Sequence, residues 1–167
     1  MHIREAVAGD AQVVVGIYNH YVLGTTITFE ELAVPQVEMA SRIEDVQAAG
    51  LPWLVAEHDG VVVGYAYATK WRVRPAYRFS VESTVYMAPE FAGQGAGTSL
   101  YSALLQRLAE TGCHLVIGGI AQPNAGSVAL HEKLGFEKVG EFKEVGLKFG
   151  RWIDVGYWQK KLNPMTS

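Results

Sequence analysis

The sequence predicts one α/β or α+β domain, residues 1–167, in which helices flank a single mixed β-sheet. Three observations support this class. The length of 167 residues suits one domain with a substantial core, and 49% of the residues are hydrophobic. Apolar residues recur with helical spacing in some segments and form β-prone runs in others. The expected elements follow the order βααβββαβαββ, without an internal repeat.

Charge and composition narrow the functional classes. The net charge of −3 does not favour nucleic acid or an anionic membrane as the main partner. No apolar run reaches the roughly 20 residues that span a bilayer, and the N-terminus becomes polar too soon for a signal peptide. The single cysteine, Cys113, cannot form an internal disulfide and is expected to be a partly buried thiol. We therefore expect a cytoplasmic protein with no metal site.

The first half of the chain is expected to contain three strands and two helices. Asp10 is a candidate N-cap for the first helix, and the second begins at a proline and ends before a glycine. The pair Asp59-Gly60 between two apolar runs indicates a β-hairpin. The expected bounds are a strand at 2–6, helices at 10–22 and 35–50, and a strand pair within 52–71.

The second half is expected to contain four strands and two helices. A stripe of leucines identifies the buried face of a helix from about Thr98 to Glu110. The continuous apolar run 114–120 is typical of a strand covered on both faces. The other expected elements are a strand at 78–87, a helix that starts at Asn124 and stops at Gly135, and two strands around Phe149-Gly150.

A glycine-rich loop precedes the leucine-striped helix. Gly93, Gly95 and Gly97 leave backbone amides uncovered at a helix start, where the helix dipole also favours an anion. Thr98 adds a hydroxyl. The loop therefore predicts a phosphate or pyrophosphate site, although three glycines also suit a plain tight turn. It matches neither the lysine-containing P-loop nor the dinucleotide pattern GxGxxG.

The loop "AGQGAG" followed by a helix resembles the pyrophosphate loop of the GNAT superfamily of acyl-CoA-dependent N-acyltransferases. "NAGSVALHEKLGF" resembles its second signature. Across about residues 3–162, "NHYV…TTITF", "WRVRPAY", "VESTVYM" and "GRWIDVGYWQ" resemble the phosphinothricin and methionine sulfoximine N-acetyltransferase family. Ala92 departs from the usual glutamine or arginine of the loop, which leaves coenzyme affinity open. His131 replaces a common superfamily tyrosine, as in the narrower family.

The resemblance implies acetyl transfer from acetyl-CoA to the amine of a small amino-acid-like substrate, directly within a ternary complex. Phosphinothricin, methionine sulfoximine and methionine sulfone are the leading substrates, and herbicide or antibiotic resistance would follow. It also implies a homodimer, for which the apolar ending "GRWIDVGYW" is either an interface or a buried sheet edge. The physiological substrate is left open.

Glu82 and His131 are the expected catalytic residues. Glu82 is a charge within an apolar, β-prone segment, where burial would raise its pKa toward that of a useful base. The alternative is a solvated carboxylate on an edge strand. His131 shares one helical face with Asn124 and Ser127, and the resemblance places it near the amine or the thiolate. Whether His131 acts as an acid or as a base is left open. The alternative is a histidine on the helix surface that makes one hydrogen bond.

The resemblance also assigns the coenzyme site. Backbone groups of the strand after Glu82 would pair with pantetheine, and one amide would hold the oxyanion. Asn124 also suits an N-cap, the Tyr86 side chain suits the core, and Lys133 suits a solvated helix end. The expected coenzyme-binding residues are Val85, Tyr86, Met87, Gly93, Gln94, Gly95, Ala96, Gly97, Thr98, Asn124 and Lys133.

The stretch "KWRVRPAYR" is the strongest indication of the substrate class. It places four positive charges within nine residues of an acidic protein. Arg72 and Arg74 would share one side of an extended segment, where guanidinium groups bind carboxylate or phosphinate oxygens well. An anionic amino-acid-like substrate is therefore expected, although a solvated cationic loop is the alternative. The expected substrate-binding residues are Phe29, Arg72, Arg74, Tyr77, Glu82, Ser83 and Thr84.

Two other functions are compatible with these residues. One is acetylation of a different amine, such as an amino-acid amide, a polyamine or a protein N-terminus. The other is a non-catalytic acyl-CoA-binding sensor, which would keep the glycine loop without needing Glu82 or His131. A nucleotide-binding protein is disfavoured by the missing lysine and by the lack of a metal-ligand cluster.

Overall fold

The computed structural model describes residues 1–93 and 95–162. The element order is the one expected from the sequence, and the predicted α+β class with a mixed sheet is confirmed. The strands are β1 (His2–Glu5), β2 (Trp53–His58), β3 (Val61–Lys70), β4 (Ser80–Met87), β5 (Leu115–Ala121), β6 (Glu137–Lys148) and β7 (Arg151–Lys161). The helices are α1 (Ala11–Gly24), α2 (Gln36–Ala48), α3 (Ala96–Glu110) and α4 (Ala125–Lys133).

The described strands form one seven-stranded sheet in the order β1-β2-β3-β4-β5-β7-β6. Within the described residues, β4 and β5 are the parallel pair, and the other neighbours are antiparallel. The hairpin turns are formed by Asp59-Gly60 and Phe149-Gly150, all four with positive φ as such tight turns require. Because β7 lies between β5 and β6, it is not a sheet edge.

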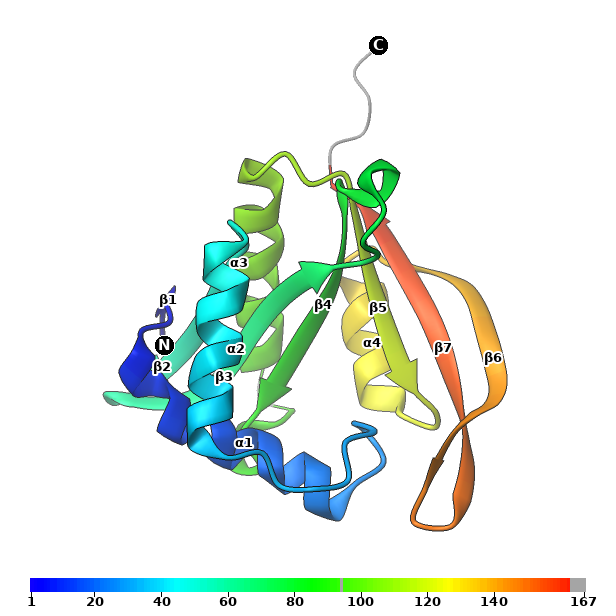
Figure 1. The fold of residues 1–167 in the computed structure, drawn as a ribbon, viewed down its shortest axis with the longest axis horizontal. Helices are drawn as coiled ribbons and strands as arrows, with labels where there is room; N and C mark the ends of the chain where they lie inside the picture. Colours follow the sequence, from blue (N-terminus) through cyan, green and yellow to red (C-terminus); the bar gives the residue numbers. More distant parts are fainter. Residues whose placement is uncertain (94, 163–167) are drawn as a thin grey trace.

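Helices cover both faces of this sheet (Figure 1). Along β2, Trp53 and Val55 point into a core with α1 and α2, whereas Leu54 and Ala56 point into a core with α3. This alternation is the two-residue period of a strand covered on both sides. The leucine stripe expected on α3 is confirmed, since Leu100, Leu104, Leu105 and Leu108 are all buried there.

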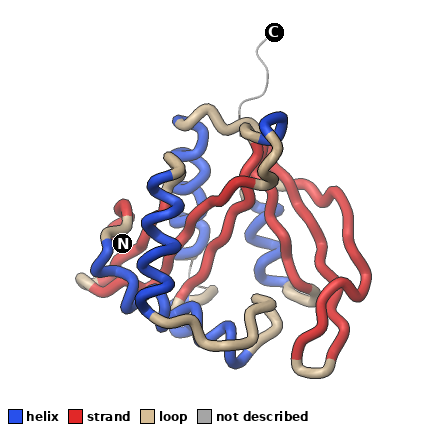
Figure 2. Tube along the Cα trace, viewed as in Figure 1, coloured by secondary structure: helices blue, strands red, loops and turns tan. Residues whose placement is uncertain are grey.

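The strands β4 and β5 separate after a short pairing. Their register runs from Ser80 opposite Leu115 to Glu82 opposite Ile117 and then stops, while β4 stays paired with β3 as far as Met87. The two strands diverge visibly in Figure 2. One edge of β4 beyond Glu82 thus has no strand partner among the described residues, and its backbone groups are open to another ligand.

Two local details differ from expectation. Asp10 is the N-cap residue of α1, as expected, but its carboxylate accepts two 2.8 Å bonds from Arg4 and one from the Val7 amide, and makes no cap bond to α1. A guanidinium offers a paired, charge-assisted alternative to the cap. The stretch around Arg72 and Arg74 is not a continuous strand, because β3 ends at Lys70, the chain bends at Val73 and Arg74, and a short 3-10 turn begins at Pro75.

The glycine loop turns the chain from β4 into α3, which begins at Ala96, two residues before the expected start. Gly93 and Gly95 have φ values of 79° and 81°, a left-handed conformation that costs other residues about 1–2 kcal/mol. Gly95 is also the residue that precedes the helix. The loop thus places the first amides of α3 at the open end of the space between β4 and β5.

Candidate active site

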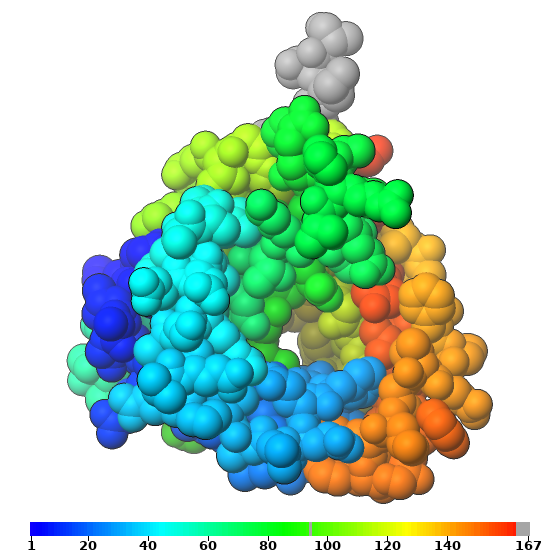
Figure 3. Space-filling model, viewed as in Figure 1, coloured from blue at the N-terminus to red at the C-terminus, as the bar shows by residue number. Residues whose placement is uncertain are grey.

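Two adjoining cavities occupy the space between the diverging strands. They measure about 310 and 480 Å³. The space-filling view shows an opening in this part of the molecule, between β4, β5, β7 and the segment after α1 (Figure 3). The residues that line both cavities are Ile27, Val85, Tyr86, Asn124, Ser127 and Leu130. These shared residues make the two cavities a continuous groove.

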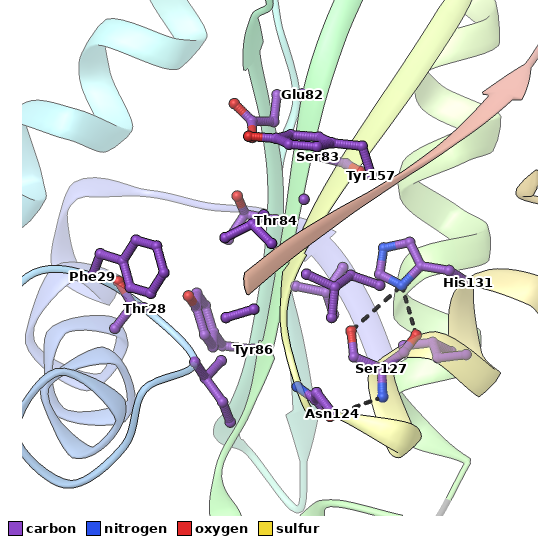
Figure 4. Close-up of a pocket in the computed structure, with 17 residues that line it drawn as sticks. Thr28, Phe29, Glu82, Ser83, Thr84, Tyr86, Asn124, Ser127, His131 and Tyr157 are labelled. Carbon is purple, nitrogen blue, oxygen red and sulfur yellow. Dashed lines mark hydrogen bonds between the residues drawn. The ribbon is translucent and has the colours of Figure 1, made fainter. Parts of the chain in front are cut away.

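The smaller cavity brings together Phe29, Glu82, Ser83, Thr84 and His131. They come from the segment after α1, from β4 and from α4, and Figure 4 shows them around one space. All five were expected from the sequence at the substrate or the reacting centre. We call this the acceptor cavity.

Three expected substrate residues do not line the acceptor cavity. Arg72, Arg74 and Tyr77 are exposed on the segment between β3 and β4. Of the three, Arg72 influences the cavity electrostatically, because its charge lowers the pKa of Glu82. The Arg72 guanidinium lies 4.5 Å from the centre of the Trp71 ring.

Glu82 lies on the central strand β4 and not on an edge strand. Its side chain is half-buried, and this burial raises the pKa of the carboxyl, while the nearby Arg72 guanidinium opposes the rise. A raised pKa makes a carboxylate a stronger base. Glu82 is therefore suited to take a proton from an ammonium group in the cavity.

His131 belongs to a buried hydrogen-bond chain. Its Nδ1 lies 2.7 Å from the Ser127 carbonyl, which can only accept, so Nδ1 carries the hydrogen. Burial lowers the pKa of His131, so the ring is neutral and Nε2 accepts from the Tyr101 hydroxyl at 2.9 Å. Tyr101 in turn lies 2.6 Å from Ser83 Oγ, which must donate to it. The chain links β4, α3 and α4.

Two glycines on β5 leave room for this arrangement. A Cβ built on Gly118 would lie 2.7 Å from His131 Nε2, and one on Gly119 would lie 3.2 Å from the Tyr157 ring and 3.5 Å from Glu82 Oε2. A side chain at position 118 would collide with the histidine. The glycine pair inside the apolar run 114–120 thus serves close packing on both faces of β5.

The larger cavity collects most of the expected coenzyme residues. Those that line it are Val85, Tyr86, Met87, Gly93, Gly95, Gly97, Thr98, Asn124 and Lys133. Ala96 is buried and does not line it, and Gln94 lies outside the described residues. Asn124 caps α4, since its Oδ1 accepts from the Ser127 amide at 3.1 Å. We call this the coenzyme cavity.

The coenzyme cavity has the features of a pyrophosphate cradle. Gly97 lies in the first turn of α3, and a Cβ built there would meet Met87 only at 3.7 Å. Packing within the described protein therefore does not demand a glycine at 97, but close approach of a ligand to this backbone would. The uncapped backbone amides at the start of α3 and the helix dipole also favour the binding of an anion. These residues fit a diphosphate-bearing coenzyme.

Sequence reasoning missed Tyr101 and Tyr157. Tyr101 is 1% exposed within the leucine-lined core of α3, where a buried hydroxyl needs a partner. A tyrosine on an otherwise leucine-rich stripe was the available signal. Tyr157 lines the acceptor cavity from β7, and burial, followed by the Glu82 charge, raises the pKa of its hydroxyl. Alternation along β7 could not distinguish this face from a plain core.

Comparison with known proteins identifies the family. The model of the acetyltransferase (GNAT) family matches residues 15–136. The chain belongs to the GNAT acetyltransferase family. A phosphinothricin N-acetyltransferase from Alcaligenes faecalis is 44% identical over 155 residues, which cover 92% of this chain and 79% of the relative. The acetyltransferase class expected from the resemblance is confirmed.

Two further relatives support this assignment. An L-methionine sulfoximine/L-methionine sulfone acetyltransferase from Salmonella typhimurium is 38% identical over 163 residues, covering 98% of this chain and 95% of the relative. A phosphinothricin acetyltransferase from Sinorhizobium meliloti, solved in complex with AcCoA, has a TM-score of 0.95 at 40% identity. That match covers 99% of this chain and 90% of the other.

The described part of the chain offers neither a cluster of metal ligands nor a membrane-spanning helix. Within residues 1–93 and 95–162, no group of three or more His, Cys, Asp or Glu side chains is placed to hold a metal ion. No helix in that part of the chain is long and apolar enough to cross a membrane.

Replacing Tyr101 by phenylalanine tests the hydrogen-bond chain. We expect the acetyl-transfer kcat to fall roughly tenfold, equivalent to one hydrogen bond of about 1.4 kcal/mol, because Ser83 and His131 lose their common partner. The pH profile should also shift, since the His131 ring loses a hydrogen-bond donor. Steady-state kinetics across pH measure both effects.

The matched control is Tyr65→Phe, because Tyr65 is equally buried but stacks on Trp53 in the opposite core. It should leave kcat and the pH profile unchanged. Equal effects of the two substitutions would mean that Tyr101 acts only through general stability.

Proposed function

We propose that this protein transfers the acetyl group of acetyl-CoA to the amino group of a small, anionic amino-acid-like substrate. Phosphinothricin, methionine sulfoximine and methionine sulfone are the leading acceptors. The observation that carries the proposal is the continuous groove between β4 and β5, with Glu82 at one end and the glycine loop at the other. It can hold an amine acceptor and a coenzyme end to end, and the relatives named above act on these acceptors.

In this proposal, Glu82 performs the first proton transfer. An α-ammonium group is mostly protonated at neutral pH and cannot attack until it loses a proton. The half-buried Glu82 carboxylate accepts this proton, directly or through water, and the raised pKa improves its basicity. Acetyl-CoA would supply the thioester carbon that the freed amine attacks; the C–S bond would then break, and the CoA thiolate would leave and take up the second proton of the amine.

The open edge of β4 can stabilise the negative charge that develops on the thioester oxygen. The hydrogen-bond chain from Ser83 through Tyr101 to His131 fixes the Ser83 hydroxyl at the wall of the acceptor cavity. Backbone amides of residues 83–87 that face β5 have no strand partner within residues 1–93 and 95–162, so one can stabilise negative charge on the thioester oxygen. Ser83 lines the acceptor cavity and is held by Tyr101, which ties its hydroxyl to His131. We assign His131 to positioning this hydroxyl, because both ring nitrogens already have protein partners.

Direct transfer agrees with the state of the single cysteine. The Cys113 thiol is buried, lines neither cavity, and lies near the Phe79 and Leu115 carbonyls. Burial raises the pKa of this thiol, which weakens it as a nucleophile. A stable acetyl-enzyme formed from acetyl-CoA alone would contradict direct transfer.

Arg72 is the residue most suited to recognise an acidic acceptor. Its charge already acts on Glu82 and Tyr157, both of which line the acceptor cavity. Arg74 and Tyr77 lie farther along the same exposed segment and remain secondary candidates. The proposal includes two expectations from the sequence, namely a cytoplasmic location and resistance to a herbicide-like compound that serves as acceptor.

A thiol-release assay with Glu82→Gln tests the proposed function. Wild-type protein should release CoA with at least one of the three leading acceptors, and kcat/KM should fall as the pH drops through the raised pKa of Glu82. That acid limb should lie above the ordinary glutamate value of about 4.3. Glu82→Gln should abolish turnover and leave acetyl-CoA binding intact.

Glu44→Gln, on the exposed face of α2, is the control and should behave as the wild type. Release only with other amines would contradict the proposed acceptors while keeping the acetyltransferase. Coenzyme binding without turnover of any amine would favour a sensor.

We also propose a homodimer formed through the β6–β7 hairpin. This edge of the sheet exposes large apolar side chains, namely Val139, Phe142, Val145, Leu147, Phe149 and Trp152. Exposed apolar clusters of this kind mark protein interfaces. Sedimentation analysis should give the mass of two 18.3 kDa chains, and Trp152→Lys should shift the protein toward the monomer. A wild-type monomer at micromolar concentration would contradict this interface.

A further inference from the structure

The segment between α1 and α2 forms one wall of the acceptor cavity. Ile27, Thr28 and Phe29 line the cavity from this side. In the space-filling view the blue atoms of this region adjoin the orange atoms of the β6–β7 hairpin (Figure 3). The contacts of this segment with β6 fix its place in the cavity wall.

Lys148, at the end of β6, anchors the wall. Its side chain is only 1% exposed, and Nζ donates to the carbonyls of Val22 at 2.8 Å and Thr28 at 2.7 Å. A buried ammonium is costly unless hydrogen-bonded, so these contacts are strongly favoured. One lysine thus binds both the last turn of α1 and the segment that carries Phe29. The backbone of the wall cannot move away from β6 without breaking this pair of bonds.

Gly146, two residues earlier on β6, receives the Phe29 ring. A Cβ built on Gly146 would lie 2.4, 2.5 and 3.0 Å from three ring atoms of Phe29. The ring therefore packs directly on bare backbone. The ring contacts Gly146 and also lines the acceptor cavity. Because the ring already touches the backbone of β6, it cannot lie any closer to that strand.

We propose that Gly146 is a specificity-determining position, which sets the length of acceptor side chain that the cavity takes. Any side chain at 146 must displace the Phe29 ring, because Lys148 holds the backbone of the wall in place. A ring pushed away from Gly146 moves into the cavity that it lines, and the cavity becomes shorter. This inference rests on the proposed function, because it assumes that the acceptor occupies this cavity.

The test compares two acceptors that differ by one methylene, methionine sulfone and S-methylcysteine sulfone. Gly146→Ala should lower kcat/KM for the longer acceptor at least fivefold more than for the shorter one, as expected when a methylene no longer fits. The KM for acetyl-CoA should not change. An unchanged ratio, or a ratio shifted toward the longer acceptor, would overturn the proposal.

Gly140→Ala is the matched control, because Gly140 lies on the same strand and a Cβ there meets nothing within 4 Å. It should leave the ratio unchanged. In a Phe29→Ala background, Gly146→Ala should become silent, since the ring that it displaces is gone. A persisting effect in that background would also overturn the proposal.

Two further results separate this inference from failure of its premises. If Gly146→Ala does not fold, Phe29→Ala alone should shift the ratio toward the longer acceptor, and an unchanged ratio would count against the proposal. If the wild type accepts neither sulfone, the proposed acceptors are wrong. The same ratio, measured on two homologous amines that it does accept, then decides the role of Gly146.

Discussion

The separation of β4 from β5 after Glu82 and Ile117 is the constraint on which the rest of the structure depends. Two parallel strands that stayed paired would consume each other's backbone groups and leave no space between them. Their divergence frees one edge of β4 and opens the groove that holds both cavities. It also sets the ends of the groove, because Glu82 is the last residue of β4 that pairs with β5, and the glycine loop follows the far end of β4.

Most buried polar groups around the groove are held in place by hydrogen bonds to other groups of the protein. Tyr101 and the Ser127 carbonyl are the hydrogen-bond partners of the two His131 ring nitrogens, burial lowers the pKa of that ring, and two carbonyls satisfy Lys148. Glu82 is the exception, since burial raises its pKa and Arg72 compensates only in part. A carboxylate that is poorly stabilised in the resting protein is a useful base, and it is the kind of local cost that an active site carries.

Local signals in the sequence predicted most of the fold. The hairpin pairs Asp59-Gly60 and Phe149-Gly150, the leucine stripe of α3 and the Asn124 cap each depend on neighbouring residues only, and all appear in the structure. The resemblance to known acetyltransferases supplied the family. It also named five residues that meet in the acceptor cavity.

What the sequence could not predict depends on distant contacts. The stop in β4–β5 pairing, the chain from Ser83 through Tyr101 to His131, and the packing of Phe29 on Gly146 join residues far apart in the chain. No periodicity encodes such pairs. The segment around Arg72 does not continue β3 as an extended strand, since the chain bends at Val73 and Arg74 before the 3-10 turn that starts at Pro75.

The central claim is that one groove holds acceptor and coenzyme end to end. Mapping of backbone amide chemical shifts, first with coenzyme A and then with methionine sulfone, tests it most directly. Coenzyme A should perturb the start of α3 and the residues from Val85 to Met87, whereas the sulfone should perturb Phe29, Glu82 and Thr84. Overlap should be confined to the shared residues near Val85 and Tyr86. Sulfone-induced shifts centred away from the β4–β5 groove would contradict the account.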